Sequence, residues 1–364
     1  MDITFLVPFK GIAGGLRVVA CYGNALIRRG HRVTVVYPKR NLAFRERLRR
    51  KVRRMIHNEK DHLDAFCGTL IEAPKIAQEY LPHSDCIIAT AFQTAQIAAE
   101  LPECCGRKFY LIQGYEKVFA REGEDVDATF RLPLKKIVIS SWLKELVEAL
   151  SGENDIPVIP NGRDFFLSCF SGEGINRPHD VGLLYSTVPL KRTDIALEAL
   201  TILRKRHPGL KIVMFGSENP DLVKYPDFPF HDVRFQRTPT QENIRRTYLD
   251  TKVWMTASST EGFCLPALEA ISLGCPIVSS DNKGIRDIIS DGVEGYIVDV
   301  GDPQAIADRV LCILEDQERL TRMSAAALRR ADAFSWEYSA DMLEDVLLNS
   351  IHRKGAKDAK KTRL

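Results

Sequence analysis

The stretch KVWMTASSTEGFCLPALEAISLGCPIVSS, from Lys252 to Ser280, predicts a strand, a loop, a short helix and a second strand. Its two apolar runs, KVWMTAS and CPIVSS, are typical of buried strands. Pro266 is well suited to the first position of a helix, and Gly274 followed by Pro276 ends that helix after about two turns. A strand, helix and strand in this order indicate one unit of a parallel sheet.

Two glutamates flank the predicted helix start. Glu261 falls in the loop, and Glu269, eight residues later, falls in the first helical turn. Between them, the backbone N–H groups of Gly262 to Leu265 should point out of a helix N-terminus, which favours an anion. A phosphate there would leave Glu269 to accept hydrogen bonds from a diol such as ribose, and Glu261 to bind hydroxyls beyond the phosphate. In the alternative, Glu269 only complements the helix dipole and Glu261 is solvated.

The same alternation of apolar runs and helical patterns extends along the whole chain and predicts α/β architecture with two domains. A polar stretch at 151–162, SGENDIPVIPNG, is suited to a linker. The expected strands are ITFLV, RVTVVYP, CIIAT, KFYLIQ and KKIVIS in the first domain, and DVGLLYS, LKIVMFG, DVRFQ, KVWMTAS, CPIVSS and GYIVDV in the second. The expected segments are a first domain at 1–150, a second at 151–335, a helix at 336–352 that crosses back to the first domain, and a basic tail at 353–364.

Two further loops carry candidate binding residues. A Gly-rich loop follows the first strand, with Gly11, Gly14 and Gly15, and this spacing is not the GxGxxG pattern of a dinucleotide fold. Such a loop allows the backbone to approach a diphosphate, although it can also serve tight packing alone. In the second domain, Lys191 follows a strand and precedes a helix, where its ammonium would attract a nearby phosphate; a lone lysine is otherwise solvated.

Composition excludes several classes of protein. The chain has 364 residues, of which 45% are hydrophobic and 27% charged, so it can bury two cores. No apolar run approaches the roughly 18 residues that span a bilayer, and the first residues lack the pattern of a secretory signal. The nine cysteines show neither zinc-ligand spacing nor a disulfide framework. We therefore expect a cytoplasmic protein with reduced cysteines.

The positive charge is concentrated in residues 39–60, which hold ten Lys or Arg against two Glu, and in the tail. Within 41–60 the apolar residues recur at helical spacing, with arginines on the other face. This pattern fits either a helix packed on its own domain or a helix docked on an anionic membrane surface. Nucleic acid binding is not expected, because the segment lacks interleaved aromatic residues and a recognisable motif.

Taken in order, these elements resemble the retaining glycosyltransferases of the GT-B fold, family four, also called glycosyl transferases group one. The resemblance rests on GHRVTVV, VIPNGRD, PLKRTDIALEAL, VMFGSEN, FSWE and above all the E-x7-E segment EGFCLPALE. The stretch QGYE, followed by TFRLPLKKIVISSWLKEL, also looks like rhamnosyltransferase-type members. The fold implied is α/β, with two Rossmann-like parallel-sheet domains facing a cleft.

The resemblance implies a metal-independent hexosyltransferase-type enzyme whose co-substrate is a nucleoside-diphosphate sugar, with no further cofactor. The first domain would bind a glycan or lipid-linked acceptor, and the second would bind the donor. Glu261 and Lys191 would be the catalytic residues, and Gln113 and Glu116 would contact acceptor or sugar. The implied donor-binding residues are Gly14, Gly15, Ser186, Lys191, Gly216, Glu261, Gly262, Phe263, Cys264, Leu265 and Glu269.

The sequence departs from the family pattern at three places. Ser186 stands where an Arg is usual, so that phosphate-binding charge is missing or comes from Arg192. Gln113 and Glu116 follow a strand after which many members carry a His, and Cys264 stands where Gly is common. The segment DVD at 125–127 formally matches the metal-binding motif of another glycosyltransferase fold, but no strand precedes it and no metal site is expected.

Three functions remain open from these residues. The first is transfer of a sugar with retention during synthesis of a surface polysaccharide or glycoconjugate. The second is a sugar epimerase or phosphorylase built on the same fold. The third, encouraged by Ser186 and the missing His, is a catalytically inert nucleotide-binding subunit.

Overall fold

The computed structural model describes residues 1–39, 61–163 and 176–361, and for 351–361 it describes the backbone alone. The chain divides into two compact units: the first comprises Met1–Gly162 with Trp336–Leu364, and the second comprises Arg163–Ser335. The sequence had assigned residues 151–162 to the second domain, whereas these residues group with the first unit. An isolated parallel β-bridge between Val138 and Val158 accounts for this, because its backbone hydrogen bonds tie the segment to the edge of the first sheet.

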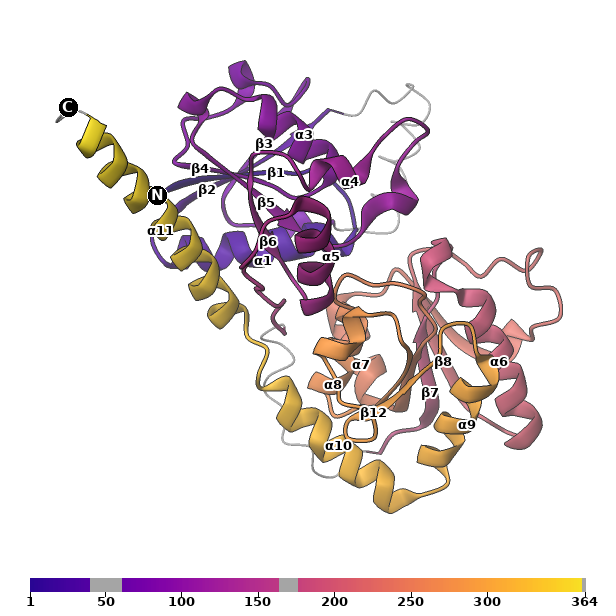
Figure 1. Cartoon of the computed structure of the whole chain (residues 1–364). Coiled ribbons are helices and arrows are strands. Elements are labelled where there is room, and N and C mark those ends of the chain that lie inside the picture. The colour runs from indigo at the N-terminus through magenta and orange to yellow at the C-terminus, as the bar shows by residue number, and fades with distance from the viewer. Residues whose placement is uncertain (40–60, 164–175, 362–364) are drawn as a thin grey trace. The chain divides into compact units, whose positions relative to one another are not determined.

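In the described part of the first unit, six parallel strands form one sheet in the order β3-β2-β1-β4-β5-β6 (Figure 1). The strands are β1 Asp2–Leu6, β2 Arg32–Pro38, β3 Thr69–Ala73, β4 Cys86–Ala89, β5 Arg107–Ile112 and β6 Lys135–Val138. The α-helices are α1 Gly14–Arg28, α3 Phe92–Glu100, α4 Val126–Thr129, α5 Ser141–Ser151 and α11 Trp336–Lys361. Strand β3 was not predicted, because it is an edge strand in which only Ala73 is buried and the apolar signal is therefore weak.

The described part of the second unit repeats this topology, with six parallel strands in the order β12-β11-β10-β7-β8-β9. The strands are β7 His179–Leu184, β8 Ile212–Gly216, β9 Val233–Arg237, β10 Thr251–Thr256, β11 Ile277–Ser280 and β12 Gly295–Val298. The helices are α6 Thr193–Arg206, α7 Gln241–Leu249, α8 Leu265–Ser272, α9 Pro303–Leu314 and α10 Gln317–Ala331. All the strands predicted for this domain are present, so the prediction of parallel α/β architecture is confirmed.

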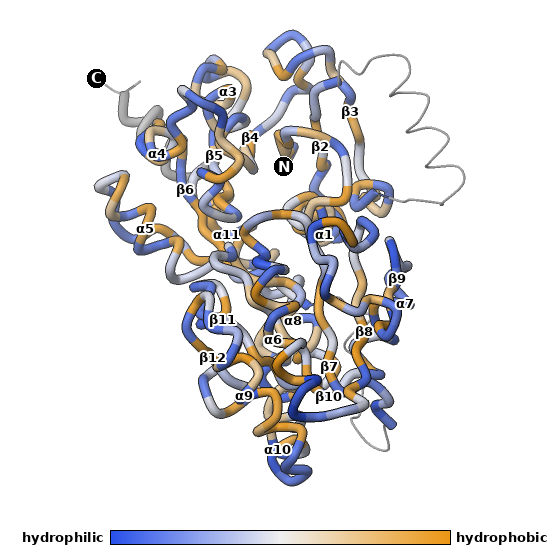
Figure 2. Tube along the Cα trace, turned by 90° about the vertical axis from the view of Figure 1, so that its right-hand side faces the viewer, coloured by the Kyte–Doolittle hydropathy of each residue, from blue (hydrophilic) through white to orange (hydrophobic). Residues whose placement is uncertain are grey.

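The central strands of the second sheet are buried on both faces, and Figure 2 shows hydrophobic residues recurring along the strands. On one face, β7, β8 and β10 pack against α6 and α9 through a cluster that includes Val253 and Met255. The residue between them, Trp254, points to the opposite face and lies over Gly182 of β7, where a Cβ atom would come within 2.5 Å of the indole ring. The glycine therefore makes room for an aromatic side chain on the face covered by α7 and α8.

Helix α11 packs along α1 within the first unit. The Arg29 guanidinium pairs with Glu337 and Asp341, at 2.9 and 2.6 Å, and the rings of Tyr22 and Trp336 meet edge to face at 5.3 Å. These contacts give a structural reason for the predicted helix that begins at Trp336. No helix in the described part of the chain has the length and apolarity to cross a membrane.

Candidate functional site

The candidate residues of the second unit lie at the point in its sheet where the order of the strands changes direction. Strands β7 and β10 are hydrogen-bonded neighbours, while the chain leaves them toward opposite edges of the sheet. The loop after β7 carries Lys191 and the loop after β10 carries Glu261. Ligands of open α/β sheets bind at the carboxyl ends of strands at such a switch point. The topology therefore brings together two loops that are far apart in the sequence.

Lys191 and Glu261 form an ion pair across this switch point. The Nζ atom of Lys191 donates to Oε1 of Glu261 at 2.6 Å, and the two side chains are 24% and 14% exposed. Burial lowers the pKa of Lys191, but the attraction of Glu261 and the hydrogen bond to it, supported by Glu269, outweigh burial and raise the pKa. The lysine is therefore held as a cation in a cavity that Lys191 and Glu261 line together with Ser258 and Pro266.

The loop that carries Glu261 is fixed by the end of β11 and by the loop that follows it. The Glu261 backbone N–H donates to the Asn282 carbonyl at 3.0 Å, and the Ser280 hydroxyl donates to the Ser258 carbonyl at 2.5 Å. Gly284 permits this close approach, because a Cβ atom there would lie 2.8 Å from the Glu261 carbonyl oxygen. Glu261 is therefore presented from a rigid loop and is not the solvated residue of the alternative interpretation.

Helix α8 begins one residue earlier than predicted, at Leu265, so Pro266 occupies its second position. Cys264 caps the helix with φ of +67°, in the left-handed region that glycine adopts without cost. This conformation explains why glycine is common there in the family that the sequence resembles. Burial raises the pKa of the Cys264 thiol to about 12, so the thiol stays neutral.

Glu269 lies in the second turn of α8, and its predicted place in the first turn was wrong because the helix starts at Leu265. Its side chain is buried, with 8% of the residue exposed. The hydroxyl of Tyr248 donates to its Oε2 atom at 2.8 Å. A buried, hydrogen-bonded carboxylate beyond the first turn does not serve merely to complement the helix dipole.

The remaining candidates of the second unit shape the backbone. Ser186 joins the turn before α6, where its carbonyl accepts from the Thr193 hydroxyl at 2.6 Å and its own hydroxyl accepts from the Val188 N–H at 3.2 Å. Arg192 pairs with Asp194 at 3.0 Å, so its charge is already engaged on the surface. Gly216 ends β8, where a Cβ atom would lie 2.5 Å from the backbone oxygen of Tyr185.

The candidates of the first unit cluster at the carboxyl ends of its own strands. A Cβ atom at Gly15, in the first turn of α1, would lie 3.2 Å from Oε1 of Gln113, whereas Gly14 begins the helix. Gln113 follows β5, and its Nε2 atom lies 3.5 Å from the Thr90 carbonyl. Glu116 accepts the Phe92 backbone N–H at 2.8 Å, at the start of α3. Burial raises the pKa of Glu116 to about 7, so this carboxyl group titrates near neutral pH.

The DVD segment has a local structural role. Asp125 accepts the Ala128 N–H at 3.1 Å and so caps α4, while Asp127 accepts from the Tyr115 hydroxyl at 2.8 Å and pairs with Lys117 at 3.2 Å. Across the described residues, no group of three or more His, Cys, Asp or Glu side chains is arranged to hold a metal ion. The structure therefore assigns these aspartates to the loop and its short helix.

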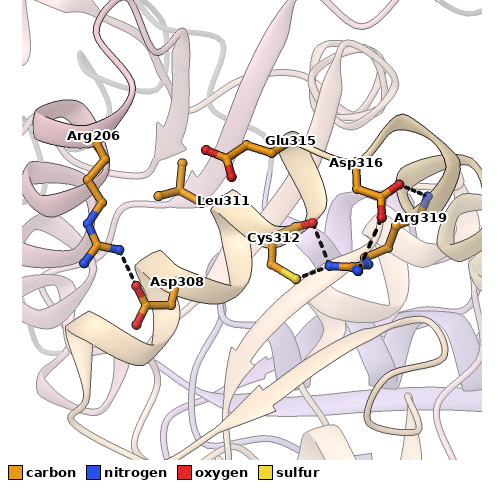
Figure 3. Close-up of a pocket in the computed structure, with 7 residues that line it drawn as sticks. All are labelled: Arg206, Asp308, Leu311, Cys312, Glu315, Asp316 and Arg319. Atoms are coloured by element: carbon orange, nitrogen blue, oxygen red, sulfur yellow. Dashed lines mark hydrogen bonds and ion pairs between the residues drawn. The ribbon is translucent and has the colours of Figure 1, made fainter.

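A surface hollow of about 460 Å³ lies elsewhere on the second unit, between α6, α9 and the start of α10 (Figure 3). Four of its charged side chains form two ion pairs: Arg206 with Asp308, and Arg319 with Asp316 at 3.3 Å. It shares no lining residue with the cavity of Lys191 and Glu261. The size of this hollow alone does not make it a binding site.

The basic segment falls outside the described residues. The prediction of an anionic membrane surface for 39–60 depends on Phe44, Leu48, Val52, Met55 and Ile56, and the structure does not describe residues 40–60 or the side chains of 351–364. Membrane docking and cytoplasmic localisation therefore stay predictions.

Comparison with known proteins gives the second unit a family. Residues 183–330, which include Lys191, Glu261 and Glu269, match the family model described as glycosyl transferases group 1. The second unit is a group 1 glycosyltransferase domain. The resemblance stated from the E-x7-E segment is thereby confirmed.

Sequence relatives of this glycosyltransferase domain cover only part of the chain. A D-inositol 3-phosphate glycosyltransferase of Frankia alni is 33% identical over 46% of this chain and 44% of its own length. A poly(glycerol-phosphate) alpha-glucosyltransferase of Bacillus subtilis is 25% identical over 66% of this chain and 36% of its own length. The matches thus span less than half the length of these relatives.

Solved structures extend the likeness to both units. TarM aligns with a TM-score of 0.74 over 95% of this chain and 98% of its own, at 13% identity. HepE of Anabaena, solved in complex with UDP and glucose, aligns with a TM-score of 0.72 over 96% and 100%, at 17% identity. At these identities the likeness shows the fold alone, and the prediction of the GT-B fold is confirmed.

Sequence reasoning missed two residues that hydrogen-bond the site glutamates. Tyr248 donates to the Glu269 carboxylate, and the Asn282 carbonyl accepts the Glu261 N–H. Tyr248 sits in the last turn of α7 directly before β10, so the pattern indicates only a buried aromatic residue. Asn282 follows β11 in SSDNKG, where a polar loop is expected for other reasons. Neither partner could be assigned without the register of the parallel strands.

Proposed function

We propose that this protein transfers a hexose from a nucleoside-diphosphate sugar to a glycan or lipid-linked acceptor, with retention of configuration. The observation that supports the proposal best is the ion pair of Lys191 and Glu261 at 2.6 Å at the switch point of the second sheet. A cation held beside a carboxylate suits a donor that joins an anionic diphosphate to a sugar rich in hydroxyls. Buried Glu269 lies on the helix that begins beside this pair.

Each site residue has a role in this proposal. Lys191 and the backbone amides of Gly262 to Leu265 bind the diphosphate and stabilise the charge that develops on the leaving group. Glu261 binds hydroxyls of the donor sugar, and Glu269 accepts hydrogen bonds from the ribose. Fixed donors then provide the stabilisation that a metal ion supplies in other transferases. In the first unit, Gln113 and Glu116 contact the acceptor or the sugar.

The relatives support the classes of donor and acceptor. HepE was solved with UDP and glucose, and TarM of S. aureus was solved with UDP and alpha-GlcNAc-glycerol, which fits a nucleotide-sugar donor. The poly(glycerol-phosphate) alpha-glucosyltransferase acts on a polymer, which fits a glycan or glycoconjugate acceptor. We therefore propose a role in the synthesis of a surface polysaccharide or glycoconjugate.

Thermal shift with UDP, GDP and dTDP tests donor binding, and release of nucleotide from the corresponding sugar donors tests catalysis. We expect one nucleotide to stabilise the protein and its sugar donor to be hydrolysed slowly. Binding without hydrolysis or transfer would favour the inert subunit, and conversion of the free sugar donor to an isomer would favour the epimerase. If no nucleotide stabilises the protein, the proposal is wrong.

Glu269→Gln gives a sharper test of the ribose contact. Loss of a charged acceptor should cost about 1.5–3 kcal/mol of nucleotide affinity, or about tenfold to hundredfold in Kd, as measured by calorimetry. Glu294→Gln is a matched control, because Glu294 is also buried and accepts the Ser290 N–H at 2.8 Å before β12. Equal losses in the two variants would contradict the role of Glu269.

A further inference from the structure

Tyr248 connects the end of α7 to the middle of α8. It lies in the last turn of α7 and is fully buried, with 0% of the residue exposed. Its hydroxyl donates to Oε2 of Glu269 at 2.8 Å, so a hydrogen bond joins two side chains that are 21 residues apart in the sequence. A hydrogen bond to a carboxylate inside the protein is stronger than a neutral one and defines the orientation of its acceptor.

The ring of Tyr248 is itself held by packing. Its centroid lies 4.4 Å from that of Trp254 and 5.8 Å from that of Phe215, which meets it edge to face. The backbone is also anchored, because Arg177 donates through one nitrogen to the Tyr248 carbonyl at 3.1 Å and through another to the Leu273 carbonyl at 2.7 Å. One arginine thus joins the C-terminal ends of α7 and α8. The hydroxyl therefore has little freedom to follow Glu269 if the carboxylate turns.

We propose that Tyr248 is a positioning residue, which holds the Glu269 carboxylate in the orientation that accepts the ribose hydroxyls of the nucleotide. The inference rests on the proposed function, since it concerns the ribose contact of the same site. A glutamate has three rotatable side-chain bonds, and ordering them during binding would cost affinity. A carboxylate already ordered by a rigid tyrosine loses less freedom when ribose binds, so the affinity gained from the ribose hydroxyls is larger.

A purely structural role for Tyr248 would have a different consequence. If Tyr248 only provides a hydrogen bond to a buried carboxylate, its loss would lower folding stability and would weaken the binding of all nucleotides to the same extent. Loss of a positioning residue changes the difference in binding affinity between nucleotides that carry ribose hydroxyls and nucleotides that lack them. The ratio of the two dissociation constants separates these roles and does not depend on the overall stability of the variant.

The experiment uses the full chain and whichever of UDP, GDP or dTDP stabilises it, and compares the ribonucleotide (5-methyl-UDP where dTDP is the ligand) with the corresponding 2′,3′-dideoxy form. We expect the wild type to bind the ribo form at least about tenfold more tightly. Tyr248→Phe, which keeps the ring, should reduce that ratio about tenfold while the Kd of the dideoxy form stays within about twofold. In a Glu269→Gln background, Tyr248→Phe should leave the ratio unchanged, because the acceptor it positions has been altered.

Tyr185→Phe is the matched control, because Tyr185 is buried in the same unit and its hydroxyl accepts the Asp221 N–H at 2.8 Å. This variant should keep the wild-type ratio. The inference is overturned if Tyr248→Phe weakens both forms equally, if it leaves the ratio unchanged, or if the wild type does not distinguish the two forms. Failure of the wild type to bind any of the nucleotides would overturn the proposed function as well, so the two failures are distinguishable.

Discussion

Neutralising Lys191 should weaken nucleotide binding, whereas neutralising its partner Glu261 should not. Lys191→Met removes the cation that the diphosphate needs, and Glu261→Gln removes the carboxylate that competes with the diphosphate for that cation. Because the Lys191 ammonium and the Glu261 carboxylate are hydrogen-bonded to each other at 2.6 Å, a change in one group alters how strongly the other interacts with the nucleotide. The signs of the two changes in Kd therefore test the arrangement.

The magnitude follows from the geometry. Two unit charges 2.6 Å apart attract by about 6 kcal/mol at an effective dielectric constant of about 20, before the cost of desolvation. Partial exposure and desolvation leave about 2 kcal/mol of net folding stability that either substitution would remove. For the nucleoside diphosphate, loss of one charged hydrogen bond in Lys191→Met should raise Kd about tenfold to hundredfold. Glu261→Gln should leave Kd unchanged or lower it by up to about tenfold, because Lys191 no longer has to be shared.

Isothermal titration of the nucleoside diphosphate measures the binding, and release of nucleotide during transfer measures the activity. Both variants should lose transfer, Glu261→Gln by about a hundredfold, since the sugar contact is made by a preorganised group. Lys252→Met is the matched control, because Lys252 pairs with Asp180 at 2.8 Å in the same unit but at the opposite ends of β10 and β7. It should lower stability without changing Kd.

One result would refute this reasoning. If Glu261→Gln raises Kd for the nucleoside diphosphate as much as Lys191→Met does, Glu261 belongs to the nucleotide contact and the division of roles is wrong. A Kd that rises in Lys252→Met would instead show that any broken ion pair disturbs the site. Urea unfolding of each variant separates these effects from loss of the fold.

Two further predictions concern stability. Because burial raises the folded pKa of Glu116 from 4.5 to about 7, this group stabilises the protein below pH 4.5 and loses that contribution as pH rises through 7. Glu116→Gln should therefore match the wild type near pH 4.5 but exceed it by up to about 3 kcal/mol at pH 8 in urea unfolding, and a difference independent of pH would contradict the burial. Arg177→Met should cost about 3 kcal/mol, since Arg177 donates to the carbonyls of Tyr248, Thr251, Leu273 and Gly274. Calorimetry should show the melting temperature falling by about 6–12 °C, and a fall below about 2 °C would show that the carbonyls find other partners.

The sequence predicts most clearly the strands that are buried along most of their length. Strands β8 and β10 of the second sheet are apolar runs bounded by loop residues, because parallel strands covered on both faces must be largely hydrophobic. The edge strand β9 is the exception, since only its first residue is buried. Strand β3 lies at an edge, where partial exposure removes that signal. The start of α8 was misplaced by one residue, because Pro tolerates either of the first two positions and Cys264 gives no sign of its left-handed backbone.

The identities of Lys191, Glu261 and Glu269 as site residues came from the sequence, because their spacing and neighbours match a family pattern. The contacts between these residues could not be read from the sequence. Lys191 and Glu261 are 70 residues apart, and they meet only because β7 and β10 are neighbours in a sheet whose order is not the order of the chain. Tyr248 reaches Glu269 for the same reason, since α7 and α8 flank β10. Local sequence determines which residues can do chemistry, whereas the strand order, set by burial over the whole sheet, decides which of them touch.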